Sequence, residues 1–185
     1  MKYIETIKAL DGEVFFLEYH QNRSGINDLQ KYLKPPQSGL FRCRVVYDES
    51  GVLDVSYHKY IKREVDKIKL VFDDEIVYDK KYLNREKIDL LFENRGECDE
   101  ILIVKNGKIT DTSIANIAFF DSKKWVTPKE PLLHGTTRER LLKSGFLVED
   151  EIFVDDIFKY EKVALLNAMI DFDIIATKDI KDIFC

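Results

Sequence analysis

The stretch that decides the fold lies in the middle of the chain and reads ILIVKNGKITDTSIANIAFF, residues 101–120. An apolar run leads to Asn106-Gly107, and a second run rich in apolar residues follows. Asn-Gly between two such runs is the preferred two-residue turn of a β-hairpin. We therefore expect antiparallel strands at residues 100–104, 108–110, 114–120 and 125–126.

Working outward, runs rich in Val, Ile, Phe and Tyr predict further strands at residues 13–19, 40–47, 53–60 and 68–72. Apolar residues at helical spacing predict a helix at about 83–93. Other helices are expected at about 24–33, 136–143 and 155–160. The fold class is α+β, with two small strand-rich lobes that divide at residue 80: a reduced amino-terminal lobe, 1–80, and a carboxy-terminal lobe, 81–185.

The composition favours a small-molecule function. The 185 residues carry a net charge of −5, with 45% hydrophobic and 34% charged residues. These values are typical of one ordinary globular chain, and the acidic balance provides no basic surface for a nucleic acid or an anionic membrane. We expect no nucleic-acid partner and no membrane partner.

The beginning of the chain, MKYIETIKALDG, has no continuous apolar core of signal-peptide length. No segment reaches the roughly 18 apolar residues that a membrane-spanning helix needs. We expect a soluble, cytoplasmic protein.

The common nucleotide, metal and hydrolase motifs are missing. The eight glycines never form GxGxxG or a P-loop, no GxSxG occurs, and the three histidines lie far apart without HExxH. We expect no metal site.

Residues 131–142, PLLHGTTRERLL, favour an anion site at the start of a helix. Gly135 permits a close approach of the backbone, and the first N–H groups of a helix point toward any bound anion. A capping box between Thr136 and Glu139 would instead satisfy those donors internally. The segment alone leaves both interpretations open.

Four segments, taken in order, resemble the pyridoxal-5′-phosphate (PLP) enzymes of fold type IV. This group includes the D-amino acid and branched-chain aminotransferases and aminodeoxychorismate lyase. The segments are Leu17–Arg23, Lys81–Arg85, Ile109–Ile117 and Gly135–Arg138, and Leu166–Met169 is a weaker fifth match.

The resemblance implies a site for PLP in which Lys81 forms the Schiff base and is the catalytic residue. It implies that Arg23, Thr136 and Thr137 bind the phosphate, and that Asp111 lies beside the pyridine nitrogen. Backbone contacts near the phosphate would come from Asn167 and Ala168. The resemblance also implies a homodimer and a small amino substrate.

Some assignments stay open in the sequence. A slip of one residue would replace Lys81 by Lys80, and Asp111, which stands where the family usually has glutamate, could be a turn residue. Arg42 and Arg44 share one face of a predicted strand and could meet a substrate carboxylate or only solvent.

The amino-terminal lobe is shorter than the family's, which usually has a Gly-rich strand before the position of Ile4. We therefore expect an aminodeoxychorismate lyase-like reaction of folate biosynthesis that releases 4-aminobenzoate and pyruvate. The alternatives are a class IV aminotransferase acting on a D-amino or branched-chain amino acid, and a PLP-binding protein without turnover.

Overall fold

The computed structural model describes residues 1–175 and 179–184, which form two compact units. The first unit holds residues 1–62 and 80–84, and the second holds residues 63–79 and 85–185. The expected lobes divided at residue 80. In the structure, residues 63–79 instead pack with the carboxy-terminal unit, and residues 80–84 pack with the amino-terminal one.

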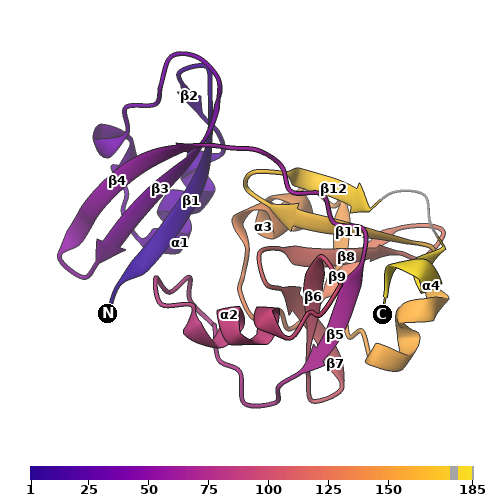
Figure 1. Ribbon diagram of the computed structural model, residues 1–185. Helices are drawn as coiled ribbons and strands as arrows, with labels where there is room; N and C mark the ends of the chain where they lie inside the picture. Colours follow the sequence, from indigo (N-terminus) through magenta and orange to yellow (C-terminus); the bar gives the residue numbers. More distant parts are fainter. Residues whose placement is uncertain (176–178, 185) are drawn as a thin grey trace. The chain divides into compact units, whose positions relative to one another are not determined.

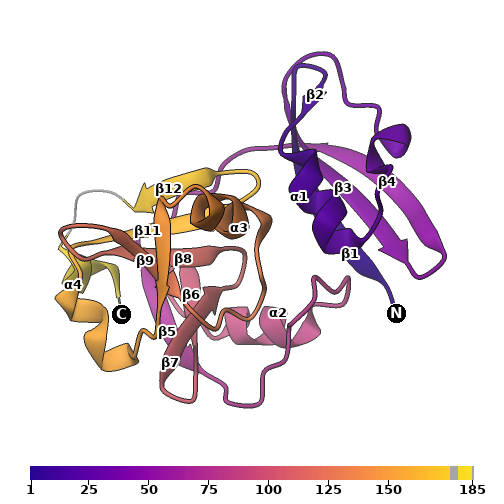
Figure 2. The same ribbon diagram turned by 180° about the vertical axis from the view of Figure 1, so that it is seen from behind.

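The first unit is a four-stranded antiparallel sheet with a short helix on one face (Figures 1 and 2). The strand order is β2-β1-β3-β4, with β1 at Tyr3–Leu10, β2 at Glu13–Val14, β3 at Leu40–Asp48 and β4 at Gly51–Lys59. Helix α1 spans Leu17–Ser24, and a 3₁₀ turn, η1, spans Leu29–Tyr32. The core of this unit comprises Ile7, Ala9, Leu29, Leu33, Cys43 and Val45.

Two expectations for this unit were wrong. The predicted helix at 24–33 is only the 3₁₀ turn η1, and the α-helix of this unit lies earlier, because Gly25 adopts a left-handed conformation, φ 74°, and ends α1 there. The predicted strand at 13–19 pairs only at Glu13–Val14, since the chain turns into α1 at Phe16, φ 53°. Strand β1 was not predicted at all.

The second unit is built on an eight-stranded sheet in which β10-β9-β8-β7-β6-β5 follow one another and β11 pairs with both β8 and β12. The pairs β5–β6 and β9–β10 are parallel, and the others are antiparallel. The strands are β5 Ile68–Phe72, β6 Glu100–Lys105, β7 Lys108–Thr112, β8 Asn116–Phe120, β9 Trp125–Pro128, β10 Leu147–Asp150, β11 Lys162–Asn167 and β12 Asp171–Ile175.

Helices lie around this sheet: α2 at Glu86–Glu93, α3 at Thr136–Lys143, the 3₁₀ helix η2 at Val154–Lys159 and α4 at Ile180–Ile183. Strand β8 is buried on both faces, since Ile117 and Phe119 join one apolar cluster while Ala118 joins another with Leu141 of α3. This explains why its sequence, NIAFF, is apolar without alternation. Strands β6 to β9 and helix α3 were predicted close to their observed bounds, whereas β10 and β12 were missed.

No helix in the described ranges, 1–175 and 179–184, is both long and apolar enough to cross a membrane.

Candidate active site

The Asp111 carboxylate is the centre of a closed hydrogen-bond network in the second unit. Its Oδ1 accepts a hydrogen bond from Asn116 Nδ2 at 2.7 Å, and its Oδ2 accepts one from the backbone N–H of Leu133 at 2.8 Å. Asn116 Nδ2 also donates to the Leu133 carbonyl at 2.8 Å. The network ties the end of β7 and the start of β8 to the loop that leads into α3.

Gly135 fits this network only because it has no side chain. A Cβ built on Gly135 would lie 1.9 Å from Asn116 Oδ1, well inside contact distance. Its φ of −73° suits any residue, so the requirement for glycine is steric. Gly135 thus allows the asparagine amide to reach both Asp111 and Leu133.

Asp111 is buried among these donors, and its pKa is unusual. Burial raises the pKa of this carboxyl from 3.8 to about 6, although the hydrogen bonds from Leu133 and Asn116 and the charge of Arg138 act in the opposite direction. The carboxylate is mainly ionised at neutral pH. A cationic group placed beside it would stabilise the ionised form further.

The start of α3 has no side-chain cap, so the capping box is not formed. The N-cap residue is Gly135, which has no side chain to accept a hydrogen bond, and Thr136 is the first helical residue. Glu139 does not reach back, since its Oε1 binds Lys143 Nζ at 2.6 Å. The capping-box interpretation of this segment is therefore wrong. Thr136 and Thr137, both buried, are the first two residues of the helix, where backbone N–H groups have no partner within the helix.

Asn167 is the last residue of β11, and Ala168 follows it. The Asn167 side chain orders this turn, because Oδ1 accepts hydrogen bonds from the N–H groups of Met169 and Ile170 at 2.9 and 3.1 Å. Its Nδ2 donates to the Ile114 carbonyl at 3.3 Å. The turn is thereby joined to residues 112–115, which follow Asp111. Ala168 is half-buried in the same turn.

Arg23 belongs to the first unit, where it forms an ionic cluster with Glu5 and His20. Arg23 Nε donates to Glu5 Oε1 at 2.8 Å, and His20 Nδ1 lies 2.6 Å from Glu5 Oε2. Burial of Glu5 opposes ionisation, but the Arg23 charge and the hydrogen bonds from His20 and Arg23 prevail and lower its pKa to about 2. Glu5 therefore fixes one edge of the Arg23 guanidinium, as a buried anion.

Lys81 lies in the segment that pairs with the beginning of β1. Its carbonyl accepts a hydrogen bond from the Ile4 N–H at 2.9 Å, and the next residue, Tyr82, forms an antiparallel bridge with Tyr3. The Lys81 side chain is half-buried. Lys80, by contrast, is exposed, with Nζ 5.7 Å from the centre of the Tyr3 ring. The two lysines thus differ in environment.

Arg42 and Arg44 lie on β3, on the side opposite the buried Cys43. Arg42 is exposed and Arg44 is half-buried. Neither belongs to the network around Asp111, which is confined to the second unit.

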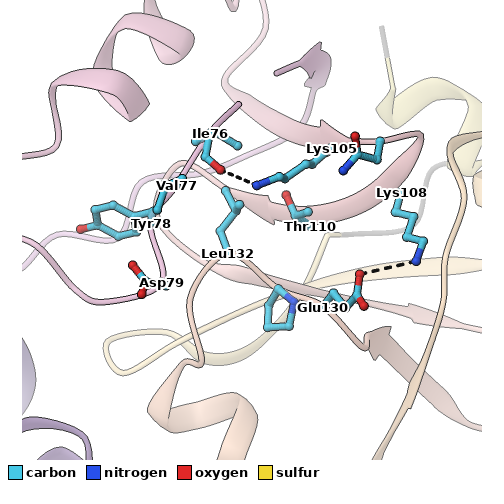
Figure 3. Close-up of a pocket in the computed structure, with 11 residues that line it drawn as sticks. Ile76, Val77, Tyr78, Asp79, Lys105, Lys108, Thr110, Glu130 and Leu132 are labelled. Carbon is cyan, nitrogen blue, oxygen red and sulfur yellow. Dashed lines mark hydrogen bonds and ion pairs between the residues drawn. The ribbon is translucent and has the colours of Figure 1, made fainter. Parts of the chain in front are cut away.

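A cavity of about 270 Å³ opens on the second unit (Figure 3). Thr110 and Leu132 line it, together with Lys105, whose Nζ donates to the Ile76 carbonyl at 2.7 Å. Thr110 precedes Asp111 on β7, so the two side chains point to opposite faces of the strand. None of the predicted site residues is among those that line this cavity.

Several residues that shape these sites were not predicted as site residues. Glu5 and Gly135 act through close contacts with residues distant in sequence, and Asn116 was noted only as part of a motif. The spacing of Asp111 and Asn116, five residues across a turn, was a usable signal for their pairing.

The order and pairing of these elements define the α+β fold of the PLP enzymes of fold type IV. Residues 79–175 match the amino-transferase class IV family. The crystal structure of a "putative 4-amino-4-deoxychorismate lyase" from Haemophilus somnus 129PT is 34% identical, with a TM-score of 0.80, and the match covers 91% of this chain and 96% of that one.

Two further proteins are similar to this chain. An uncharacterised protein of Haemophilus influenzae is 44% identical over 135 residues, which are 73% of this chain and 71% of that protein. The structure of a "putative amino-acid aminotransferase" from Mesorhizobium loti shares the fold at 18% identity, with a TM-score of 0.76 over 94% of this chain and 97% of that one. The chain belongs to the class IV aminotransferase family.

Proposed function

We propose that this chain binds PLP and catalyses an aminodeoxychorismate lyase-like reaction that releases 4-aminobenzoate and pyruvate. The observation that carries the proposal is the 34% identity with the Haemophilus somnus structure over nearly the whole of both chains. A curated relative from Schizosaccharomyces pombe with a similar description, "putative aminodeoxychorismate lyase", is 36% identical over 75 residues, or 32% of its length.

The donors in the second unit fit the phosphate of the cofactor. The open start of α3 offers backbone N–H groups and the hydroxyls of Thr136 and Thr137, with no acidic cap in competition. In the first unit, Arg23 Nε and Nη2 donate to Glu5. We propose that Arg23 also serves the phosphate, for which a guanidinium is well suited.

We propose that Asp111 and Lys81 serve the other end of the cofactor. Asp111 is a buried carboxylate that would hold a proton on the pyridine nitrogen, as an electron-withdrawing ring requires. PLP supplies that electron sink when it is bound. The Lys81 amine would bind the cofactor and move a proton at the carbon next to the substrate's amino group.

The aminotransferase alternative uses the same residues and is favoured by the name of the matching family. A transaminase binds two substrates in turn and leaves the amino group on the cofactor between them. A lyase binds one substrate and returns the cofactor unchanged. The two reactions therefore differ in what a single substrate does to the visible spectrum.

The test is to load the protein with PLP and add single L- and D-amino acids without a keto acid. The lyase proposal predicts no conversion to the pyridoxamine spectrum, but release of pyruvate and 4-aminobenzoate from aminodeoxychorismate. Rapid conversion by a common amino acid would instead establish a transaminase. If neither assay detects a reaction while PLP is bound, the result would favour a PLP-binding protein without turnover.

We also propose a homodimer that acts on a small amino substrate within folate biosynthesis. The acidic net charge of −5 is consistent with a partner other than a nucleic acid. Sedimentation of the PLP-loaded protein would determine its oligomeric state.

A further inference from the structure

We infer that Arg85 and Glu100 are positioning residues that clamp the turn after Asp111 and so hold the Asp111–Asn116 pair in place. The inference rests on the proposed function, in which Asp111 meets the cofactor. It assigns a role to two charged side chains that, among the described residues, form hydrogen bonds with the turn and not with Asp111 itself.

The clamp closes on both sides of one residue, Ser113. The Ser113 N–H donates to Glu100 Oε1 at 3.2 Å, and the Ser113 carbonyl accepts a hydrogen bond from Arg85 Nη2 at 2.8 Å. Both contacts involve an ionised side chain, and such hydrogen bonds are stronger than those between neutral groups. The backbone of Ser113 is thus held between an anion and a cation.

Glu100 is fully buried at the start of β6, where an unpaired carboxylate would be costly. Its Oε1 also accepts the Ile101 N–H at 2.9 Å, and its Oε2 binds the guanidinium of Arg63. Arg63 in turn lies over the Phe92 ring, 5.2 Å from its centre. These partners compensate the buried charge of Glu100. They also fix the position of Glu100 Oε1, which accepts the hydrogen bond from the Ser113 N–H.

The position of Arg85 is set by the backbone at the start of α2. It is the N-cap residue of α2 and makes no capping hydrogen bond with its side chain. Its contact with Asp89 is weak, at 3.5 Å and with Asp89 exposed, whereas the contact with Ser113 reaches a strand connection 28 residues away. The principal partner of its guanidinium is therefore the turn.

The turn needs this support because the two strands that it joins, β7 and β8, are barely paired with each other. The register of β7 with β8 records one pair, Asp111 opposite Asn116. Within the turn, Thr112 Oγ1 binds both the N–H and the carbonyl of Ala115 at 3.0 Å. Without the clamp, the turn would keep these local contacts and the Asn167 contact with Ile114, and Asp111 and Asn116 would keep their contacts with Leu133.

A first experiment uses the protein without cofactor, by measuring the Asp111 carboxyl pKa with NMR in the wild type and in Arg85→Ala. If the clamp holds Asp111 in its buried position, its loss should expose the carboxyl and shift the pKa from about 6 toward 3.8. Removal of a positive charge by itself would raise the pKa, so the two effects have opposite signs. An unchanged or raised pKa would overturn the inference.

Two further variants give this experiment its controls. Arg85→Lys retains a cationic donor and should restore part of the wild-type pKa. Arg95→Ala removes an arginine that lies 4.2 Å from the centre of the Phe92 ring and donates to the Phe92 carbonyl, away from Ser113. The pKa of Asp111 should be unaffected there, and a shift as large as in Arg85→Ala would count against a specific clamp.

A second experiment measures the dissociation constant of PLP in a double-mutant cycle with Asp111→Asn. Arg85→Ala should weaken binding about 10-fold when Asp111 is present, the loss typical of one charge-assisted hydrogen bond, and little in the Asp111→Asn background. Equal effects in both backgrounds would show that Arg85 does not act through Asp111. If the wild type binds no PLP, the proposed function fails, and the NMR titration still decides the clamp.

Discussion

The side-chain amide of Asn116 lies 2.7 Å from the Asp111 carboxylate and is the only described side chain that donates a recorded hydrogen bond to it. The same nitrogen donates to the Leu133 carbonyl at 2.8 Å. One amide therefore sets the position of an acid on β7 relative to the loop before α3. Any change that displaces Asn116 should affect both.

Gly135→Ala is the most direct way to displace it. The new Cβ would meet Asn116 Oδ1 at 1.9 Å, so the amide must move and its two hydrogen bonds weaken. We expect the free energy of unfolding to fall by about 1–3 kcal/mol, the usual cost of overpacking. The affinity for PLP should fall as well, which a fluorescence titration would measure.

Gly145→Ala is the matched control, at the other end of α3. Gly145 has a φ of +75°, so alanine is strained there, but its Cβ would meet no atom within 4 Å. This variant should lose about 1 kcal/mol of stability and keep the wild-type affinity for PLP. Equal losses of affinity in both variants would mean that the Asn116 contact is irrelevant to the cofactor.

The Asp111 carboxyl should give the cofactor-free protein a characteristic pH dependence. Its pKa is about 6 in the folded protein and ordinarily 3.8, so the folded state binds more protons between these values. The contribution of Asp111 to the free energy of unfolding therefore falls as pH rises from about 4 to about 6, by about 3 kcal/mol in all.

Asp111→Asn should abolish this decline, which urea unfolding at pH 4, 5, 6 and 7 would detect. Exposed Glu13 supplies the control, since Glu13→Gln should retain the wild-type pH dependence. With cofactor bound, the same Asp111→Asn variant should lose on the order of 10²-fold in turnover. A wild-type pH dependence in Asp111→Asn would refute the raised pKa.

The strands from residue 100 to residue 128 could be predicted because their signals are local: an Asn-Gly turn and apolar runs. The start of α3 was predictable for the same reason. Glu5 was not predicted, because a single glutamate in an alternating segment is typical of an exposed strand. Its burial depends on His20 and Arg23, which are 15 and 18 residues away and meet it only in the folded sheet.

The open start of α3 shows a similar limit. Thr136 and Glu139 have the spacing of a capping box, but the helix begins one residue earlier than that motif requires, with Gly135 at the N-cap. The clash that a side chain at position 135 would cause comes from Asn116, on another strand. Such contacts are set by packing between elements and leave no periodic signal in the sequence.

Arg23→Ala should affect stability and cofactor affinity by separate routes. It leaves Glu5 buried with His20 as its remaining recorded partner, and an uncompensated buried charge costs about 3–5 kcal/mol. The double variant Arg23→Ala/Glu5→Gln removes that charge and should recover much of the stability. Both variants should bind PLP about 10- to 100-fold more weakly. Recovery of affinity along with stability would exclude Arg23 from the phosphate site.

Lys81 should be the residue to which borohydride fixes the cofactor. Its side chain is half-buried, whereas Lys80 is exposed and its ammonium lies near the face of the Tyr3 ring. A lysine that attacks a carbonyl must also be held in place against the cofactor, which suits the less exposed side chain. Mass spectrometry of the digested, reduced protein should locate the label on Lys81. The Lys80→Ala variant should keep both the borohydride label and the yellow colour of bound PLP. The Lys81→Ala variant should lose them. A label that persists in Lys81→Ala would show that another lysine has this role.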